Sequence, residues 1–157
     1  MTDSINYKIW TVCMIQDGDK ILLLDRQHDE FKGFIPPGGK VEFPESIVDS
    51  AIREVKEETG LEVSNLMFKG LYEYVNPVSQ KRYMIFNYLT YDFKGELLED
   101  SPEGKATWVS IKDAYNLPMQ KSIQRRFPLF FKDGTFDIHV EWNDEENKEG
   151  KVVIRST

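Results

Sequence analysis

The hydrophobic positions near the start of the chain fall into two short runs. Residues 8–15 (KIWTVCMI) and residues 20–25 (KILLLD) are rich in branched and aliphatic side chains, and the polar residues 16–19 (QDGD) between them include a glycine. Runs of this length that are bounded by turn residues are typical of β-strands. The pattern therefore predicts a first strand, a tight turn and a second strand.

A second pair of strands is predicted in the middle of the chain. Residues 66–76 and residues 81–93 are long runs of aromatic and branched residues, which favour the pleated and half-buried surface of a sheet. Pro77 lies between the two runs and marks the turn. Shorter runs predict three further strands, at residues 106–111, 136–142 and 151–155.

The main helix is predicted at residues 46–59, where apolar residues recur at spacings of three and four and Gly60 follows in the position of a C-cap. Residues 111–117 and 122–131 are weaker helical stretches, and residues 27–40 are interpreted as a loop. Strands before, between and after the helices indicate a mixed sheet that is covered by helices.

Three carboxylates gather along the predicted main helix. At about 100° per residue around the helix axis, the apolar side chains span an arc from Ile47, at about 0°, to Ile52, at about 140°. Glu54 and Glu58 lie near the border of this arc, at about 340° and 20°. Partly desolvated carboxylates raise one another's pKa or need a cation. Hard divalent cations take oxygen ligands, so the pattern favours a metal-binding helix; the alternative is an acidic surface helix.

Composition places the chain among folded proteins with one core. The chain has 157 residues, with 40% hydrophobic and 13% aromatic content, well above what disordered chains contain. No stretch approaches the roughly 20 apolar residues of a membrane span, and no secretory signal is visible. We therefore expect a cytosolic (cytoplasmic) protein with no membrane partner. Cys13, the only cysteine, is expected in the core.

The net charge narrows the range of partners. The charge is −7, with 27 acidic against 20 basic residues, which argues against binding duplex nucleic acid through a broad basic face. An anionic small molecule remains compatible with this charge, because carboxylates reach phosphates through a divalent cation. With one cysteine and two histidines, a metal site built from cysteine or histidine is not expected.

The acidic helix belongs to a longer motif. From Gly39 the chain reads GKVEFPESIVDSAIREVKEETGL, in which Glu45, an Arg-Glu pair, a Glu-Glu pair and Gly60 follow at fixed spacings. Seven fixed positions at average residue usage match by chance in a chain of this length on the order of one time in a million. Without a mismatch, residues 39–61 resemble the signature of the Nudix hydrolase family.

The resemblance implies a fold, an activity and a cofactor. It implies an α+β protein with the Nudix fold, an α/β/α sandwich with a central mixed sheet, formed by a single domain over residues 1–157. It also implies hydrolysis of a nucleoside diphosphate linked to another moiety, with Mg²⁺ or Mn²⁺ to activate water and relieve the phosphate charge. A nucleotide is then the partner, and a homodimer is compatible with the family.

The resemblance also assigns roles to individual residues. It assigns metal binding to the backbone carbonyl of Gly38 and to the helix carboxylates Glu54, Glu57 and Glu58. Catalytic roles fall to Arg53, whose guanidinium fork orients a carboxylate, and to Glu57 as one candidate for the general base. A later segment, ELLEDSPEG, supplies the alternative bases Glu96, Glu99 and Glu103.

Three further motif positions are structural. Gly39 lets the backbone approach the metal closely, Glu45 pairs with Arg53, and Gly60 ends the helix. Pro44 stands where the family usually has glycine. Because proline suits the first turn of a helix, we expect a shifted start of the helix with intact metal binding.

The substrate is less strongly indicated. Tyr72 and Tyr74 alternate onto one face of a strand, where they either stack on a nucleobase or pack in the core. Their placement resembles that in MutT-type enzymes that hydrolyse 8-oxo-dGTP. The mammalian relative reads the base through an asparagine where this chain has Ile35, so the same hydrogen bonds are not available. Three basic residues either contact a phosphate tail or lie on a solvated helix face: Lys121, Arg125 and Arg126.

Two classes of function follow. The first is an enzyme that hydrolyses a nucleoside triphosphate, such as 8-oxo-dGTP or another purine nucleotide, to a monophosphate and pyrophosphate. Alternative substrates in this class are ADP-ribose, a dinucleoside polyphosphate and an RNA 5′ end. The second class is a nucleotide-sensing Nudix domain without turnover. A sensor is expected to have lost motif carboxylates, whereas this chain keeps them together with Arg53, which favours catalysis.

Overall fold

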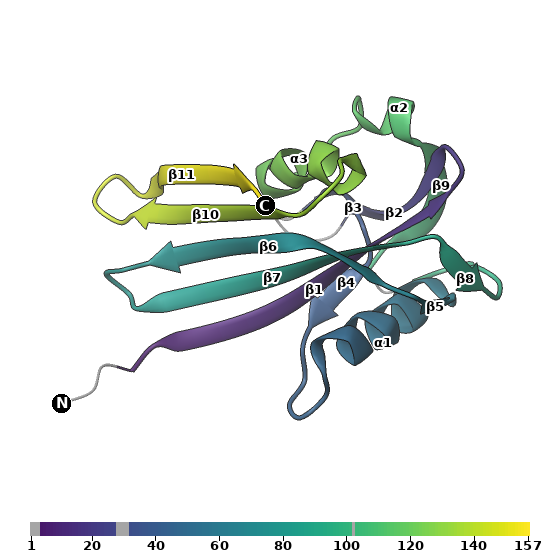
Figure 1. The fold of residues 1–157 in the computed structure, drawn as a ribbon, viewed down its shortest axis with the longest axis horizontal. Helices are drawn as coiled ribbons and strands as arrows, with labels where there is room; N and C mark the ends of the chain where they lie inside the picture. Colours follow the sequence, from purple (N-terminus) through teal and green to yellow (C-terminus); the bar gives the residue numbers. More distant parts are fainter. Residues whose placement is uncertain (1–3, 28–31, 102) are drawn as a thin grey trace.

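The computed structural model describes residues 4–27, 32–101 and 103–157. The main sheet in this part of the chain comprises nine strands: β1 (Asn6–Asp17), β2 (Lys20–Arg26), β3 (Gly33–Ile35), β4 (Gly38–Lys40), β6 (Met67–Asn76), β7 (Lys81–Thr90), β9 (Lys105–Ser110), β10 (Phe136–Asn143) and β11 (Lys148–Ser156). Their order is β11-β10-β6-β7-β1-β2-β3, with β4 paired to β1 and β9 paired to β2 (Figure 1).

The main sheet is mixed. β1 runs parallel to β7, from Asn6 opposite Lys81 to Ile15 opposite Thr90, and β10 runs parallel to β6. The other pairs in this sheet are antiparallel. Because successive side chains of a strand point to opposite faces, these registers determine which residues share a face. The mixed sheet predicted from the strand and helix pattern is confirmed.

Helix α1 (Ile47–Thr59) has the ends that its sequence predicts. The hydroxyl of Ser46 accepts a hydrogen bond from the backbone N–H of Asp49, and Gly60 follows the helix in the left-handed region with φ 84°. Both features satisfy backbone groups that a helix end leaves unpaired. Pro44 precedes the N-cap by two residues and lies outside the first turn, so the helix begins where its apolar pattern begins.

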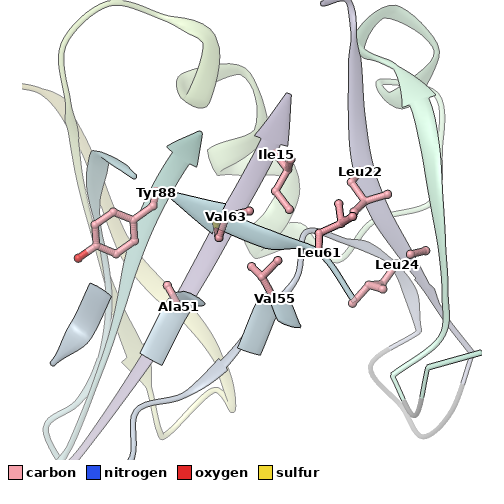
Figure 2. Packing of buried hydrophobic residues seen from close by; sticks show 10 residues of the cluster. Ile15, Leu22, Leu24, Ala51, Val55, Leu61, Val63 and Tyr88 are labelled. Carbon is pink, nitrogen blue, oxygen red and sulfur yellow. The ribbon is translucent and has the colours of Figure 1, made fainter. Parts of the chain in front are cut away.

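Helices cover both faces of the sheet. Val55 of α1 packs with Cys13 and Ile15 of β1 in one fully buried cluster (Figure 2). Val12, on the opposite face of β1, packs in a second cluster with Phe127, which follows α3 (Lys121–Arg126). The α/β/α arrangement is therefore confirmed. Among the described residues, no helix has the length and apolar character to cross a membrane.

The remaining helices are shorter than predicted. α2 (Ile111–Ala114) covers only the first part of residues 111–117. The stretch 122–131 divides into α3 and the 3₁₀ helix η1 (Phe127–Phe131), which has Pro128 in its first turn. Proline has no backbone N–H and cannot continue an α-helical ladder, which accounts for the division.

Two segments differ from the sequence prediction. Residues 27–40 were predicted as a loop, but their described part contains β3 and β4. The run 81–93 is broken at Tyr91: β7 ends at Thr90, and β8 (Asp92–Lys94) pairs with β5 (Glu62–Ser64) in a separate small sheet. Strands of three residues carry no periodic pattern of their own and form because a neighbouring strand supplies the pairing.

Candidate active site

A cavity of about 590 Å³ lies where β1, β4, β7, α1 and α3 meet. Carboxylates of α1 and the glycine backbone of β4 line one part of it, and aromatic and aliphatic side chains of β1 and β7 line another. Ligand sites in proteins are typically concave, largely apolar and equipped with a few polar groups. This cavity is therefore the candidate active site.

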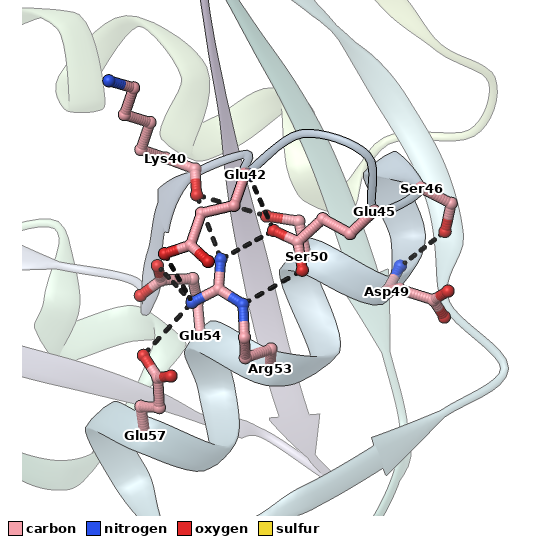
Figure 3. Close-up of polar contacts among 9 residues, drawn as sticks. All are labelled: Lys40, Glu42, Glu45, Ser46, Asp49, Ser50, Arg53, Glu54 and Glu57. Carbon is pink, nitrogen blue, oxygen red and sulfur yellow. Dashed lines mark hydrogen bonds and ion pairs between the residues drawn. The ribbon is translucent and has the colours of Figure 1, made fainter.

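Arg53 holds together the carboxylates at the start of α1 and on its outer side (Figure 3). Its Nε and Nη2 donate to the two carboxylate oxygens of Glu45, at 3.0 and 2.7 Å. Its Nη1 donates to Glu54 at 3.0 Å and to Glu57 at 3.2 Å, and Nη2 also donates to the carbonyl of Lys40 at 3.1 Å. The hydrogen bonds from Arg53 lower the pKa of Glu45 to about 2, so Glu45 is ionised at neutral pH.

Glu58 has the opposite environment. Its side chain is buried, with a relative exposure of 6%. Burial raises the pKa of Glu58, and the carboxyl groups of Glu54 and Glu103 raise it further, against a hydrogen bond with the Gly38 backbone that lowers it. A buried carboxyl group beside two others favours either a bound proton or a bound cation.

The two glycines of β4 allow close packing around these carboxylates. A Cβ on Gly38 would lie 2.0 Å from the carbonyl oxygen of Thr11, and a Cβ on Gly39 would lie 2.3 Å from the carboxyl carbon of Glu54. Neither position has room for a side chain. The backbone of β4 therefore lies directly against Glu54 on one side and against β1 on the other.

The residues at this end of the cavity fit a hard divalent cation in their chemistry. Glu54 and Glu58 supply carboxylate oxygen atoms next to one another and beside the Gly38 backbone, and oxygen is the ligand type that Mg²⁺ and Mn²⁺ prefer. In the described ranges, no three acidic, histidine or cysteine side chains are arranged as a metal-binding group. Glu57, the third carboxylate of α1 to which metal binding was assigned, differs from Glu54 and Glu58, because its side chain is 58% exposed and bonds to Arg53.

Of the three later carboxylates, Glu103 lines the cavity. Its Oε2 accepts a hydrogen bond from Nη1 of Arg26 at 2.8 Å, and its charge acts on Glu58. Glu96 and Glu99 are both described and do not belong to the lining. The structure thus distinguishes among three residues that the sequence left equivalent.

Tyr72 and Tyr74 lie behind the wall of the cavity. Tyr72 is 4% exposed, and its ring centroid lies 4.7 Å from the guanidinium carbon of Arg126. Tyr74 stacks between Tyr83, at 5.5 Å between ring centroids, and Trp142, at 6.1 Å. Neither tyrosine is among the lining residues; each contacts a residue that is.

Apart from Ile35, the aromatic and aliphatic lining comes from residues that the sequence analysis did not single out. Trp10 and Ile85 are opposite each other in the β1–β7 pair, and Trp10 packs against Tyr83 edge to face at 5.2 Å. These residues come together only through the parallel pairing of β1 with β7, which joins segments far apart in the chain. Alternation along β1 predicts that Trp10 and Val12 share a face, but not that a cavity lies there.

The three basic residues of α3 have three different environments. Lys121 is 76% exposed and lies 3.8 Å from Glu149. Arg125 donates to Glu149 at 2.7 Å through Nη1. Arg126 is 2% exposed and lines the cavity. The interpretation of the cluster as a solvated helix face is therefore wrong for Arg126, because α3 lies with this side against the sheet.

Comparison with known protein families gives a match over most of the chain. The family model of the NUDIX domain matches residues 7–130. An uncharacterized Nudix hydrolase of Bacillus subtilis, YvcI, is 37% identical over 114 residues, which cover 69% of this chain and 70% of the relative. YtkD of the same organism, named a putative 8-oxo-dGTP diphosphatase, is 29% identical over 85% of this chain and 77% of its own length.

Comparison with solved structures agrees with the sequence comparison. The crystal structure of a MutT protein from Bacillus halodurans aligns with a TM-score of 0.80 and 28% identity, over 94% of this chain and 97% of that chain. The likeness therefore covers the β10–β11 hairpin region as well as the part that the family model matches.

Proposed function

The chain belongs to the NUDIX domain family and is a Nudix-type nucleotide pyrophosphohydrolase, and from this we propose that its substrate is a nucleoside triphosphate. Water attacks a phosphorus atom of the triphosphate, and the products are a nucleoside monophosphate and pyrophosphate. The family uses divalent metal ions; Mg²⁺ or Mn²⁺ is the cofactor that we propose here.

One observation supports this proposal most strongly. The same cavity is lined by the carboxylates Glu54, Glu58 and Glu103 and by the aromatic rings of Trp10 and Tyr83. A nucleotide has a polyanionic end and a flat aromatic end, and it needs both kinds of surface. The chemistry of the cavity thus matches both halves of such a ligand.

The proposed metal ligands are Glu54, Glu57, Glu58 and the backbone carbonyl of Gly38. A divalent cation bound there supplies charge neutralisation at the phosphate oxygens and lowers the pKa of a bound water. Arg53 holds Glu54 through its Nη1 and so restricts the orientations of that carboxylate. Its bond to Glu57 ties Glu57 to the same guanidinium as Glu54, although Glu57 is largely exposed.

Glu103 is the general base that we propose in place of Glu57. It lines the cavity and interacts with Glu58, whereas Glu57 is 58% exposed and is not among the lining residues. Its carboxylate accepts the proton of the attacking water. Arg26, which donates to Glu103 at 2.8 Å, fixes the orientation of that carboxylate.

The proposal is tested by measuring the release of pyrophosphate and phosphate from a panel of nucleotides with Mg²⁺ and with Mn²⁺. The panel contains canonical and 8-oxo nucleoside triphosphates, ADP-ribose, a diadenosine polyphosphate and triphosphorylated RNA. The expected result is pyrophosphate release from nucleoside triphosphates at the highest kcat/KM. A higher kcat/KM for another member would contradict the proposed substrate class.

The same panel separates an enzyme from a nucleotide sensor. A sensor would bind members of the panel, as measured by calorimetry, without releasing pyrophosphate or phosphate from any of them. The motif carboxylates and Arg53 are all present and in contact with one another, which supports turnover.

A further inference from the structure

The cavity is lined from both faces of the main sheet. Glu54 and Glu58 come from α1 on one face, and Ser122 and Arg126 come from α3 on the other. A ligand that contacts both groups must therefore extend from one side of the sheet to the other. A nucleotide whose phosphates lie at the carboxylate end would present its base at the α3 end.

Arg126 is fully buried at the α3 end. Its Nε donates to the carbonyl of Ser122 at 3.0 Å, its Nη1 donates to Oδ1 of Asn87 at 2.9 Å, and the guanidinium lies over the ring of Tyr72. Within the residues that the structure describes, Arg126 forms no ion pair with a carboxylate. Burial lowers the pKa of Arg126 to about 10, so it stays protonated at neutral pH.

Asn87 is held so that its oxygen faces Arg126. Its Nδ2 donates to the carbonyl of Gly70 at 3.1 Å and to the carbonyl of Ile85 at 2.9 Å. The two amide hydrogens are thereby occupied, and the oxygen is left for the guanidinium. The position of Arg126 is therefore set by the sheet and not by a counter-charge.

A buried cation without a counter-charge is costly, and the cost falls when a ligand supplies acceptors. The guanidinium has five N–H donors; one is bonded to Ser122 and one to Asn87. The remaining donors form a planar fork that can bind two adjacent acceptors at once. Arg126 lines the cavity, so these acceptors are expected on the ligand.

The surrounding wall indicates which part of the ligand reaches Arg126. Trp10 and Ile85 are paired on β1 and β7, Ile123 comes from α3, and all three line the same cavity as Arg126. They provide an apolar surface suited to a ring. A guanine-type base carries a carbonyl oxygen and a ring nitrogen side by side, which an arginine binds bidentately, whereas adenine carries an amino donor there.

We propose that Arg126 is a specificity-determining residue that selects a 6-oxopurine base, such as guanine or hypoxanthine, over adenine. The proposal rests on the proposed function in one respect, because it places the phosphates at the carboxylate end. It does not require turnover. Binding measurements therefore test it separately from the hydrolysis that the nucleotide panel measures.

The test is calorimetric titration of the full chain with four nucleoside monophosphates: GMP, IMP, AMP and purine riboside 5′-monophosphate. IMP and the purine riboside nucleotide form a matched pair, because the latter lacks the 6-oxo group. We expect the wild-type protein to bind IMP at least about tenfold more tightly than it binds purine riboside 5′-monophosphate, as a bidentate contact predicts. The protein is likewise expected to bind GMP more tightly than AMP.

Substitution of Arg126 should remove this discrimination. We expect Arg126→Met and Arg126→Lys to bind IMP and purine riboside 5′-monophosphate with affinities within about threefold of each other. Methionine has no donor, and lysine has no planar fork. Lys121→Gln is the matched control. Lys121 is a basic residue of the same helix, but it is 76% exposed, lies 3.8 Å from Glu149 and does not line the cavity, so the ratio should persist.

Four outcomes overturn the proposal. The first is equal affinity of the wild-type protein for IMP and the purine riboside nucleotide, which needs no variant and holds even if the variants fail to fold. The second is no binding of any monophosphate up to millimolar concentration. The third is an equal loss of affinity for all four ligands in folded Arg126 variants, which indicates a structural role. The fourth is a matching loss of inorganic pyrophosphate binding, which assigns Arg126 to the phosphates.

Discussion

Each carboxylate around the cavity has its own polar environment, and the environments suit different roles. Glu45 is held ionised by Arg53, Glu58 is buried next to Glu54, and Glu103 bonds to Arg26 at the edge of the lining. Glu45 lies outside the lining and has both oxygens bonded to Arg53, which suits it to positioning. A residue that faces the ligand is suited to proton transfer.

Replacement of Glu103 by glutamine is expected to reduce kcat for the best nucleotide of the panel by about 10²–10⁴-fold, the usual contribution of a general base. KM should change little, because glutamine keeps the shape of the side chain. The measurement is steady-state hydrolysis across pH, with circular dichroism to confirm folding.

Glu99→Gln is the matched control, because Glu99 lies in the same loop but outside the lining of the cavity. It should leave kcat unchanged. If Glu103→Gln kept turnover within about threefold of the wild type, far less than the contribution of a general base, Glu103 would lose its role and Glu57 would be the remaining candidate.

At the scale of elements, an ion pair joins α3 to the edge strand β11. Arg125 donates to Glu149 at 2.7 Å and to the hydroxyl of Tyr72 on β6 at 3.1 Å. The hydrogen bonds from Arg125 hold the pKa of Glu149 below its usual range. This contact holds α3, and with it the Arg126 side chain, against the sheet.

The Arg125–Glu149 pair predicts a pH-dependent difference in stability. The pKa of Glu149 is lowered in the folded state. The ionised carboxylate therefore contributes to the free energy of unfolding above the unfolded pKa of about 4.3, and this contribution is lost as the pH falls through the folded pKa. Wild type should exceed Glu149→Gln in free energy of unfolding by about 1 kcal/mol or less at pH 7. The difference should approach zero at low pH.

Urea unfolding at several pH values measures this difference. Glu146→Gln is the control, since Glu146 is exposed and pairs only with the exposed Lys148 among the described ion pairs. A difference between wild type and Glu149→Gln that grew as the pH fell would contradict the sign of the predicted shift.

Local pattern predicts some of these elements well and others poorly. α1 was predicted to within one residue at its start and with its C-cap Gly60, because caps and helical periodicity are encoded within a few neighbouring residues. The strands β3 and β4 were missed because three residues carry no period. The burial of Arg126 was also missed, since it depends on Asn87 and Tyr72, which are distant in the chain.

The residues of the candidate site also fall into a group that the sequence indicated and a group that it did not. The carboxylates of α1 and the glycines of β4 lie in one continuous motif, so the sequence alone indicated them. Trp10 and Ile85, which form part of the apolar lining, meet only when β1 pairs in parallel with β7. Such a pairing is a property of the whole topology, and no window of the sequence contains it.

At the scale of the whole molecule, cation binding should be visible as stability. A ligand that binds only the folded state stabilises it by RT ln(1 + [L]/Kd), which is about 2.7 kcal/mol at 100 times Kd. Mg²⁺ or Mn²⁺ is therefore expected to raise the melting temperature of the wild-type protein. Glu54→Gln should abolish this rise, because Glu54 is one of the proposed ligands.

Without divalent cations, Glu54→Gln should be as stable as the wild type or more stable, because it removes one of two adjacent carboxylates. Thermal melts with the cation and with a chelator measure both effects. Glu62→Gln is the control, since Glu62 pairs with Lys56 away from the cavity. An equal rise with the cation in wild type and Glu54→Gln would remove Glu54 from the metal site.

The packing of the tryptophans gives the protein an optical reporter of its own. Trp10 lines the cavity against Tyr83, whereas Trp108 packs on Phe93 and Trp142 on Tyr74, outside the lining. A planar ligand in the cavity therefore changes the surroundings of one indole and leaves the other two unchanged. Intrinsic fluorescence can follow occupancy of the cavity in real time without a label, and Trp10→Phe identifies the source of the signal.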